Sequence, residues 1–252
     1  MSGGVDSSLC AYLLKEAGCD VTGVTMCLGI KQAEDGPSCC GGDAIEDAKH
    51  VCGQLDIPHF VFDFASLMEE KVIGKFTSEY LKGRTPNPCV DCNRYLKFGS
   101  LLQKARALGF DHLATGHYAR IEQDGNRWRL LRPADRVKDQ TYFLYPMMKA
   151  DLPYVLFPLG GLTKDEVRKL ALAAGLHVAT KAESQDICFT PHGDYGRVFS
   201  DRSLSVPDGD IVDRSGKILG RHRGIIHYTI GQRGGLGISA KRPLYVLDLD
   251  AQ

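Results

Sequence analysis

Nine residues at the start of the chain decide its fold: Met1-Ser2-Gly3-Gly4-Val5-Asp6-Ser7-Ser8-Leu9. Apolar residues follow at once in Cys10-Ala11-Tyr12-Leu13-Leu14, so the sequence predicts a helix over residues 6–16 that ends at Gly18. Glycines before a helix let the backbone approach a ligand without a Cβ clash. Unbonded N–H groups and the positive end of the helix dipole favour an anion at the same place. The stretch therefore predicts an anion-binding loop.

The loop is not a Walker A loop, because it lacks the terminal Gly-Lys-Ser/Thr. Its Ser-Gly-Gly-Val-Asp-Ser order resembles the PP-loop of enzymes that cleave ATP between the α and β phosphates. A capped helix start after a glycine turn, with no ligand, is the structural alternative.

Composition narrows the class of protein. The 252 residues carry 31 basic and 31 acidic side chains, which argues against a generally basic coat for nucleic acid but leaves room for a local basic face. The hydrophobic content of 43% is ample for a core. No run approaches the ~18 apolar residues of a membrane helix, and no signal peptide precedes the loop. A soluble cytoplasmic protein without membrane contact is expected.

Cysteine usage points to chemistry. The number is odd and the chain is long, which disfavours a secreted disulfide framework and favours metal-binding or catalytic thiols. The cysteines are Cys10, Cys19, Cys27, Cys39, Cys40, Cys52, Cys89, Cys92 and Cys188. Cys10 and Cys52 fall on predicted helices and are expected to be packing residues, whereas Cys39 and Cys40 are expected to be loop thiols.

Strands and helices alternate along most of the chain. The patterns predict strands over residues 20–26, 59–62 and 112–115, and helices over 43–55, 65–81, 92–108, 164–174 and 226–230. Asp43 and Thr163 are the expected N-caps, and Asp124-Gly125-Asn126 predicts a hairpin turn. Residues 29–42 are expected to be irregular.

This alternation predicts an α/β fold, with a doubly wound parallel sheet up to about Phe189 and ligands at the carboxyl ends of its strands. We expect an ATP-binding catalytic domain over residues 1–198 and a small β-rich module over 199–252. A strand normally leads into a phosphate loop, yet Met1 already lies in the loop. We therefore expect the chain to be truncated at its start.

Two segments place thiols near candidate chemistry. In Gly83-Arg84-Thr85-Pro86-Asn87-Pro88-Cys89-Val90-Asp91-Cys92-Asn93, we expect Cys92 at a helix start, where the pKa of a thiol is lowered. The Cys-x-x-Cys spacing also suits a metal, and a buried thiol pair is the structural alternative. In Glu183-Ser184-Gln185-Asp186-Ile187-Cys188-Phe189, the apolar neighbours make Cys188 a core thiol when it is taken alone. Together with Cys89 and Cys92 it becomes a third ligand or a redox partner.

Three more segments carry polar groups beside glycines or turns. In Ala114-Thr115-Gly116-His117-Tyr118-Ala119-Arg120, Gly116 permits close approach of a ligand, and His117 is either an acid/base or a satisfied structural group. In Lys138-Asp139-Gln140-Thr141-Tyr142-Phe143-Leu144, Lys138 suits a phosphate, and Asp139 and Gln140 suit a base or ribose. Residues 224–237 read either as an RNA contact or as a compact cluster of turns.

Six ordered segments together resemble the tRNA-specific 2-thiouridylase family (tRNA uridine 2-sulfurtransferases, MnmA/TrmU) of the PP-loop ATPase superfamily. They are SGGVDSS, GRTPNPCVDCN, LATGHYAR, KDQTYFL, ESQDICF and HYTIGQRGGLGI, and the resemblance covers nearly the whole chain. It implies an enzyme that replaces the 2-oxygen of the wobble uridine in tRNA with sulfur. ATP adenylates that oxygen and pyrophosphate is released.

The resemblance also implies roles for single residues. Cys188 would carry a persulfide received from a sulfur-relay protein, and Cys92 would be the nucleophile or would resolve the persulfide by forming a disulfide with Cys188. Mg²⁺ would bridge the ATP phosphates, and the protein is expected to be a monomer. The implied ATP-binding residues are Met1, Ser2, Gly3, Gly4, Val5, Asp6, Ser7, Met26 and Gly116. The implied tRNA-binding residues are Asn87, Pro88, Cys89, Lys138, Asp139 and Gln140.

The chain departs from the family in two further ways. Many members have Asp where this chain has Cys89, so Cys89, Cys92 and Cys188 form a candidate [4Fe-4S] site, and cluster chemistry and persulfide chemistry both stay open. Members usually end in a third, β-barrel domain, which this chain is expected to lack.

Some of these motifs also fit two other functions. One is a PP-loop synthetase acting on a small molecule, although the Cys92 and Cys188 pair argues against it. The other is a zinc- or cluster-binding RNA module without turnover, which would bind tRNA and form no AMP.

Overall fold

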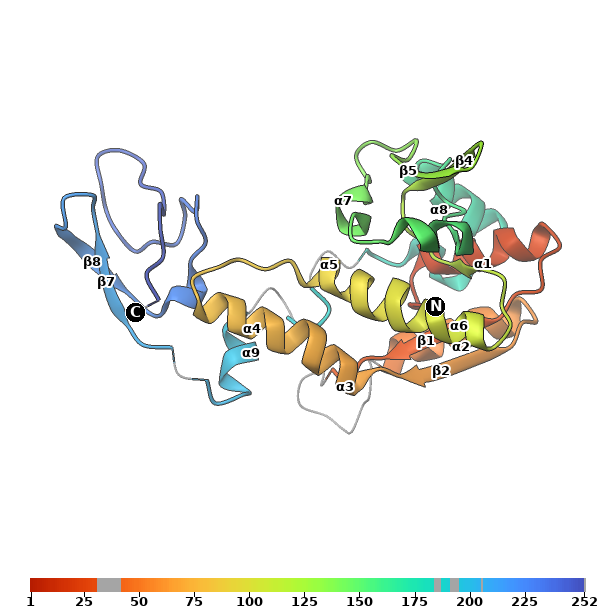
Figure 1. The fold of residues 1–252 in the computed structure, drawn as a ribbon, viewed down its shortest axis with the longest axis horizontal. Coiled ribbons are helices and arrows are strands. Elements are labelled where there is room, and N and C mark those ends of the chain that lie inside the picture. The colour runs from red at the N-terminus through yellow and green to blue at the C-terminus, as the bar shows by residue number, and fades with distance from the viewer. Residues whose placement is uncertain (31–41, 184–186, 191–194, 205, 252) are drawn as a thin grey trace. The chain divides into compact units, whose positions relative to one another are not determined.

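The computed structural model describes residues 1–30, 42–183, 187–190, 195–204 and 206–251. Contacts divide the chain into two compact units (Figure 1). The first unit comprises Met1–Glu69 and Cys89–Gln185, and the second comprises Glu70–Pro88 and Asp186–Gln252. Among the described helices, none has the length and apolar character that a membrane crossing requires.

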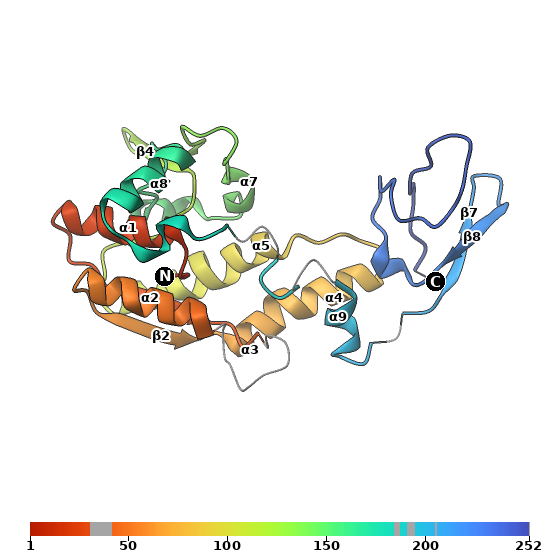
Figure 2. The same ribbon diagram turned by 180° about the vertical axis from the view of Figure 1, so that it is seen from behind.

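Parallel strand pairs with connecting helices build the first unit, which confirms the α/β class. Strand β1 (Gly23–Cys27) pairs in parallel with β2 (His59–Asp63), and β3 (Leu113–Ala114) pairs in parallel with β6 (Val155–Leu156). Helix α2 (Gly42–Gln54) connects β1 to β2 and runs alongside both, as Figures 1 and 2 show. The helix already includes Asp43 in its first turn, so Asp43 is not the N-cap that the sequence predicted.

The sequence predicted one doubly wound parallel sheet. Within the described residues, the structure instead has two separate pairs of parallel strands. The edge of β1 explains part of this result. Gly23 N–H donates to Pro58 O at 2.8 Å, so the carbonyl of Val24 faces the edge away from β2. There it accepts a hydrogen bond from the nitrogen of Met1, and Thr25 Oγ1 donates to Met1 O at 3.0 Å. The start of the predicted phosphate loop (residues 1–7) thus occupies this edge of β1.

Two helices meet beside that loop. Helix α1 (Val5–Glu16) packs against α8 (Lys164–Ala173) and the 3₁₀ turn η4 (His177–Thr180). Thr163 caps α8 as expected: its hydroxyl accepts from Glu166 N–H, and the Glu166 carboxylate accepts from Thr163 N–H. The core between these elements includes the fully buried side chains of Leu9, Val51, Leu159, Val167 and Ala171. This packing brings the first residues of α1 and α8 together.

A long helical segment carries Cys92. It begins as α5 (Pro88–Asp91), continues as the π-helical η2 (Cys92–Leu101) and ends as α6 (Leu102–Ala107). The predicted start at Cys92 is wrong, because Pro88 is the first helical residue, a position that suits proline.

The remaining elements of the first unit follow the prediction in part. The expected turn joins β4 (Arg120–Asp124) to β5 (Arg127–Leu131) in an antiparallel hairpin. The short helix α7 (Thr141–Leu144) and the 3₁₀ segment η3 (Lys149–Tyr154) lead into β6. Helix α3 (Ala65–Met68) begins where a helix was predicted and passes into the second unit through the π-helical η1 (Glu69–Ile73).

An aromatic cluster holds the second unit together. Its helices are α4 (Gly74–Leu81) and α9 (Tyr195–Ser200), and its strands β7 (Gly209–Val212) and β8 (Ile218–His222) form an antiparallel hairpin. Phe76 contacts the rings of Tyr80, Phe189, Tyr195 and Phe199.

The helix predicted over residues 226–230 is only the 3₁₀ turn η6 (Ile225–His227). Tyr228 adopts an extended conformation (φ −127°, ψ 149°), and the N–H of Thr229 bonds to Gln232 Oε1 at 2.9 Å instead of to a helical carbonyl. The side chain of Gln232 therefore competes with the helix for this donor.

Candidate functional site

Glycine is required at the centre of the phosphate loop. Gly3 has φ +68°, and a Cβ there would lie 2.5 Å from the carbonyl oxygen of Ala44. Gly4 stands at the N-cap of α1 and, having no side chain, makes no capping hydrogen bond. The first-turn N–H groups of α1 are therefore not capped by a side chain and are oriented for an anion.

Gly116 lies directly against this loop. A Cβ at Gly116 would be 2.8 Å from the carbonyl carbon of Asp6 and 2.9 Å from the nitrogen of Ser7. Two residues earlier, β3 ends at Ala114, so Gly116 follows the carboxyl end of a parallel strand. Met26 is near the carboxyl end of β1, where it pairs with Phe62 and is half-buried. Both positions agree with where ligands bind in parallel sheets.

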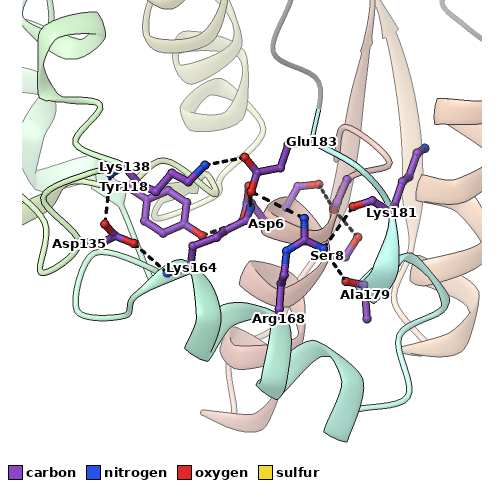
Figure 3. Close-up of polar contacts among 12 residues, drawn as sticks. Asp6, Ser8, Tyr118, Asp135, Lys138, Lys164, Arg168, Ala179, Lys181 and Glu183 are labelled. Carbon is purple, nitrogen blue, oxygen red and sulfur yellow. Dashed lines mark hydrogen bonds and ion pairs between the residues drawn. The ribbon is translucent and has the colours of Figure 1, made fainter.

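The carboxylate of Asp6 is held by two groups from distant parts of the chain. Lys164 Nζ lies 2.7 and 2.8 Å from its two oxygens, and Tyr118 Oη donates to Oδ1 at 2.9 Å. Burial and the neighbouring Asp6 raise the pKa of Tyr118, so its hydroxyl stays a donor. Figure 3 shows the three side chains converging at the start of α1. The loop is therefore braced by α8 and by the segment after β3.

Glu183 extends this network to a second lysine. Its carboxylate lies 2.9 Å from Lys164 Nζ and 2.6 Å from Lys138 Nζ, with Arg168 at 3.8 Å (Figure 3). The hydrogen bonds from Lys138 and Lys164 lower the pKa of Glu183 to about 2. Lys164 is nearly buried, with a tenth of its side chain exposed, so its two carboxylate partners compensate its charge.

The residues of the Lys138-Asp139-Gln140 segment bond to this network or to Thr141 at the start of α7. Gln140 Oε1 accepts from Tyr118 N–H at 2.9 Å, and Gln140 N–H donates to Tyr118 O at 3.1 Å. Asp139 Oδ1 accepts from the N–H and hydroxyl of Thr141 at the start of α7. Lys138 and Gln140 thus support the groups that hold Asp6.

A second brace reaches the loop from η4. Lys181 Nζ donates to Gly3 O at 3.1 Å and also contacts Asp47 of α2, which lies 3.0 Å from His177 Nε2. Hydrogen bonds from Lys181 and His177 lower the pKa of Asp47.

His117 has a structural environment. Its Nδ1 lies 2.7 Å from Thr115 Oγ1, and its ring contacts the rings of Phe98 and Phe157. Burial lowers the pKa of His117 well below its usual value, so the ring is neutral at pH 7. These contacts favour the reading of His117 as a satisfied structural group.

The thiols differ from expectation in two ways. Cys92 lies one turn inside the helix that begins at Pro88, and burial raises the pKa of its thiol, an effect that Lys97 opposes. The predicted lowering of this pKa is therefore wrong. Cys188 is exposed although Phe189 beside it is buried, so the core position that its apolar neighbours suggested is wrong too. Cys10 and Cys52 are buried, as expected of packing residues.

The candidate thiols are divided between the two units. Cys89 and Cys92 belong to the first unit, and Cys188 to the second, with Asn87 and Pro88 at the boundary. Among the described residues, no three Cys, His, Asp or Glu side chains are grouped to hold a metal. Residues 184–186, inside the segment with Cys188, and Cys39 and Cys40 lie outside the described residues.

Sequence reasoning missed the residues that brace the phosphate loop. The sequence identifies Lys164 only as the first residue of a predicted helix and indicates no role for Tyr118 or Arg168. Lys164 is 158 positions from Asp6, so no local spacing connects them. The signal that was present is a lysine directly after a capping threonine, at a helix N-terminus that should repel it.

Two family models match the chain. Residues 1–192 match the tRNA methyl transferase HUP domain, and residues 197–252 match the tRNA methyl transferase PRC-barrel domain. A solved structure, of a predicted subunit of tRNA methyltransferase from Methanocaldococcus jannaschii DSM, matches with a TM-score of 0.42 and 22% identity, over 68% of this chain and 73% of that chain.

Curated relatives match over almost the whole chain. The tRNA-specific 2-thiouridylase MnmA 1 of Syntrophus aciditrophicus (strain SB) is 58% identical, over 99% of this chain and 67% of the relative. The tRNA-specific 2-thiouridylase MnmA of Geotalea uraniireducens (strain Rf4) is 52% identical, over 100% of this chain and 69% of the relative. The enzyme of the same name in Clostridium botulinum (strain Alaska E43 / Type E3) is 48% identical, over 99% and 70%.

Proposed function

The chain belongs to the family of tRNA-specific 2-thiouridylases, and on that premise we propose that it is an ATP-dependent tRNA uridine 2-sulfurtransferase. The observation that carries the proposal is the glycine loop at the start of α1, held by Lys164 and Tyr118 through Asp6. The same unit holds Cys92. One unit thus contains an anion site for ATP and a thiol.

The reaction has two steps. First, the C2 oxygen of the wobble uridine attacks the α phosphorus of ATP, and the bond to pyrophosphate breaks. Second, a sulfur atom attacks C2, the C2–O bond breaks, and AMP leaves. Adenylation is needed because the uridine oxygen is a poor leaving group, whereas AMP is a good one.

The phosphate loop and its neighbours bind ATP in this proposal. In this proposal the phosphates bind along the loop from Met1 to Ser7, at the first-turn N–H groups of α1, and Met26 and Gly116 lie at the strand ends that would border the nucleotide. Magnesium needs only one or two protein carboxylates when phosphates and water supply the other ligands. Asp6 is the carboxylate on the loop and would supply the protein ligand to Mg²⁺.

Cys188 and Cys92 transfer the sulfur. The terminal sulfur of a persulfide on Cys188, loaded by a sulfur-relay protein, attacks C2. The Cys92 thiolate then attacks the Cys188 sulfur, so the sulfur–sulfur bond breaks, sulfur stays on the base, and a Cys92–Cys188 disulfide forms. The exposure of Cys188 suits loading by a protein. The raised pKa of Cys92 means that its thiol must lose a proton before it attacks, and Lys97 favours that loss.

A [4Fe-4S] cluster at Cys89, Cys92 and Cys188 is the competing sulfur chemistry. Among the described residues no three potential ligands are grouped to hold a metal, and we route no step through a cluster. Iron and acid-labile sulfide, measured after anaerobic purification, separate the two: we expect neither.

The other partner is tRNA. We propose that Asn87, Pro88 and Cys89 face the target base and that Lys138, Asp139 and Gln140 belong to a tRNA-contacting segment. Residues 199–252 would form a tRNA-contacting module in addition to the catalytic domain of residues 1–198. The protein would act as a monomer in the cytoplasm.

Nucleoside analysis of tRNA tests the function. Unmodified tRNA is incubated with ATP, a persulfide donor and the protein, digested, and examined by mass spectrometry. We expect 2-thiouridine at the wobble position, formed only when ATP is present. Sulfur incorporation that is independent of ATP would overturn the proposal.

A further inference from the structure

A short segment of the first unit exposes an unusual amount of apolar surface. Between residues 137 and 148, the side chains of Val137, Tyr142, Tyr145 and Met148 are 91%, 64%, 68% and 67% exposed. Scattered exposed apolar residues need no explanation, but four within twelve positions suggest an interaction site.

Buried and hydrogen-bonded neighbours hold the two tyrosines in place. Leu144, between them on α7, is fully buried, and Phe143 O accepts a hydrogen bond from Asn93 Nδ2 at 2.9 Å. The ring centroids of Tyr142 and Tyr145 are 6.2 Å apart with an angle of 48° between the planes, so each ring offers its own face. Asn93 follows Cys92 directly, so the tyrosines are anchored to the helix that carries the candidate nucleophile.

The surrounding charge is positive. Residues 127–149 contain six lysines or arginines and two aspartates, although the whole chain has no net charge. Arg132 lies 3.3 Å from Asp139, and Asp139 in turn bonds to Thr141 at the start of α7. Exposed aromatic rings beside basic groups are typical of surfaces that bind unpaired nucleotides.

We propose that Tyr142 and Tyr145 form a stacking platform for an unpaired anticodon-loop nucleotide that neighbours the modified uridine; this inference rests on the proposed function. An enzyme that acts on a base must take it out of its stack, and the neighbouring bases then lose a stacking partner. The platform replaces that partner. Because it is anchored beside Cys92, it also sets where the loop lies along that helix.

Alanine and phenylalanine substitutions test the platform. We expect Tyr142→Ala and Tyr145→Ala each to raise the Kd for tRNA by about fivefold or more, the size of one lost base–aromatic stack. Tyr142→Phe keeps the ring face and should bind like the wild type. Phe60→Ala removes another half-exposed aromatic ring of the same unit and is the matched control, with no expected change.

Fluorescence of 2-aminopurine locates the stacked base. With this base placed next to the wobble uridine, wild type and Tyr142→Phe should quench its fluorescence on binding, and the alanine variants should not. Unchanged tRNA affinity and quenching in both alanine variants would overturn the platform. So would a defect confined to sulfur delivery from a protein donor, since the surface would then bind that donor. Failure of the proposed function is distinct, because the wild type itself would then form no 2-thiouridine.

Discussion

The phosphate loop and the candidate thiols differ in how completely contacts within one unit hold their groups in place. Every described contact that braces Asp6 lies within one unit, through Lys164, Tyr118 and Glu183. The thiols are divided between two units, and burial raises the pKa of Cys92. The contacts that hold Asp6 are thus all present within one unit, whereas the sulfur chemistry uses thiols from both units, one of which must be deprotonated. The predictions below test this contrast.

The largest effect is expected at Cys188. We expect Cys188→Ser to abolish sulfur transfer and to leave adenylation detectable as pyrophosphate release, because the hydroxyl cannot carry a persulfide while the phosphate loop is untouched. Nucleoside analysis and a pyrophosphate assay on the same sample measure both steps. Cys19→Ser, at another exposed cysteine, is the control. Loss of pyrophosphate release together with sulfur transfer would mean that the two steps are not separable.

Asp6 tests the phosphate-loop side of this contrast. We expect Asp6→Ala to lower ATP affinity by about 30-fold or more, equivalent to about 2 kcal/mol, because the loop loses the carboxylate through which Lys164 and Tyr118 hold it and which would meet Mg²⁺. Titration calorimetry with a non-hydrolysable ATP analogue measures the affinity. Asp20→Ala, at an exposed carboxylate of the same unit, should bind normally. Unchanged affinity in Asp6→Ala would show that the phosphate-loop assignment is wrong.

Gly116 tests the fit of the loop against the end of β3. We expect Gly116→Ala to weaken ATP binding by about tenfold, since the added methyl group overlaps the backbone of Asp6 and Ser7 and overpacking costs about 1–3 kcal/mol. Gly161→Ala is a matched control, because a Cβ there has no neighbour within 4 Å among the described residues. Equal ATP affinities in the two variants would contradict this prediction, because the loop would then shift to accommodate the added methyl group.

The smallest effect is the acid sensitivity that Glu183 confers. Its pKa is lowered from 4.5 to about 2 in the folded protein, so its ion pairs stabilise the fold above pH 4.5 and this stability is lost as the pH falls toward 2. We expect the free energy of unfolding to fall less steeply over that range in Glu183→Gln than in the wild type. Denaturant titrations at several pH values provide the measurement, and identical slopes would contradict the pairing with Lys138 and Lys164.

The sequence predicted what local rules control. The glycine loop, the cap at Thr163 and the hairpin turn each depend on neighbouring residues, and all three are present. The predicted helix start at Cys92 was wrong, since the helix begins at Pro88, whose fixed φ suits a first helical position.

Long-range pairings could not be predicted in the same way. The contact of Lys164 with Asp6 spans 158 positions and that of Lys138 with Glu183 spans 45, and no periodic pattern records either. The exposure of Cys188 could not be predicted either, because the apolar pattern around it reflects the burial of its neighbour Phe189. Electrostatic partners of a site depend on the fold, which a motif alone does not supply.

Release of pyrophosphate from ATP by this chain, with and without tRNA, tests the central claim most directly. We predict pyrophosphate release that requires tRNA, is lost in Asp6→Ala and persists in Cys188→Ser. Pyrophosphate released equally without tRNA, or released at the wild-type rate by Asp6→Ala, would contradict the account of a phosphate loop that adenylates a tRNA base.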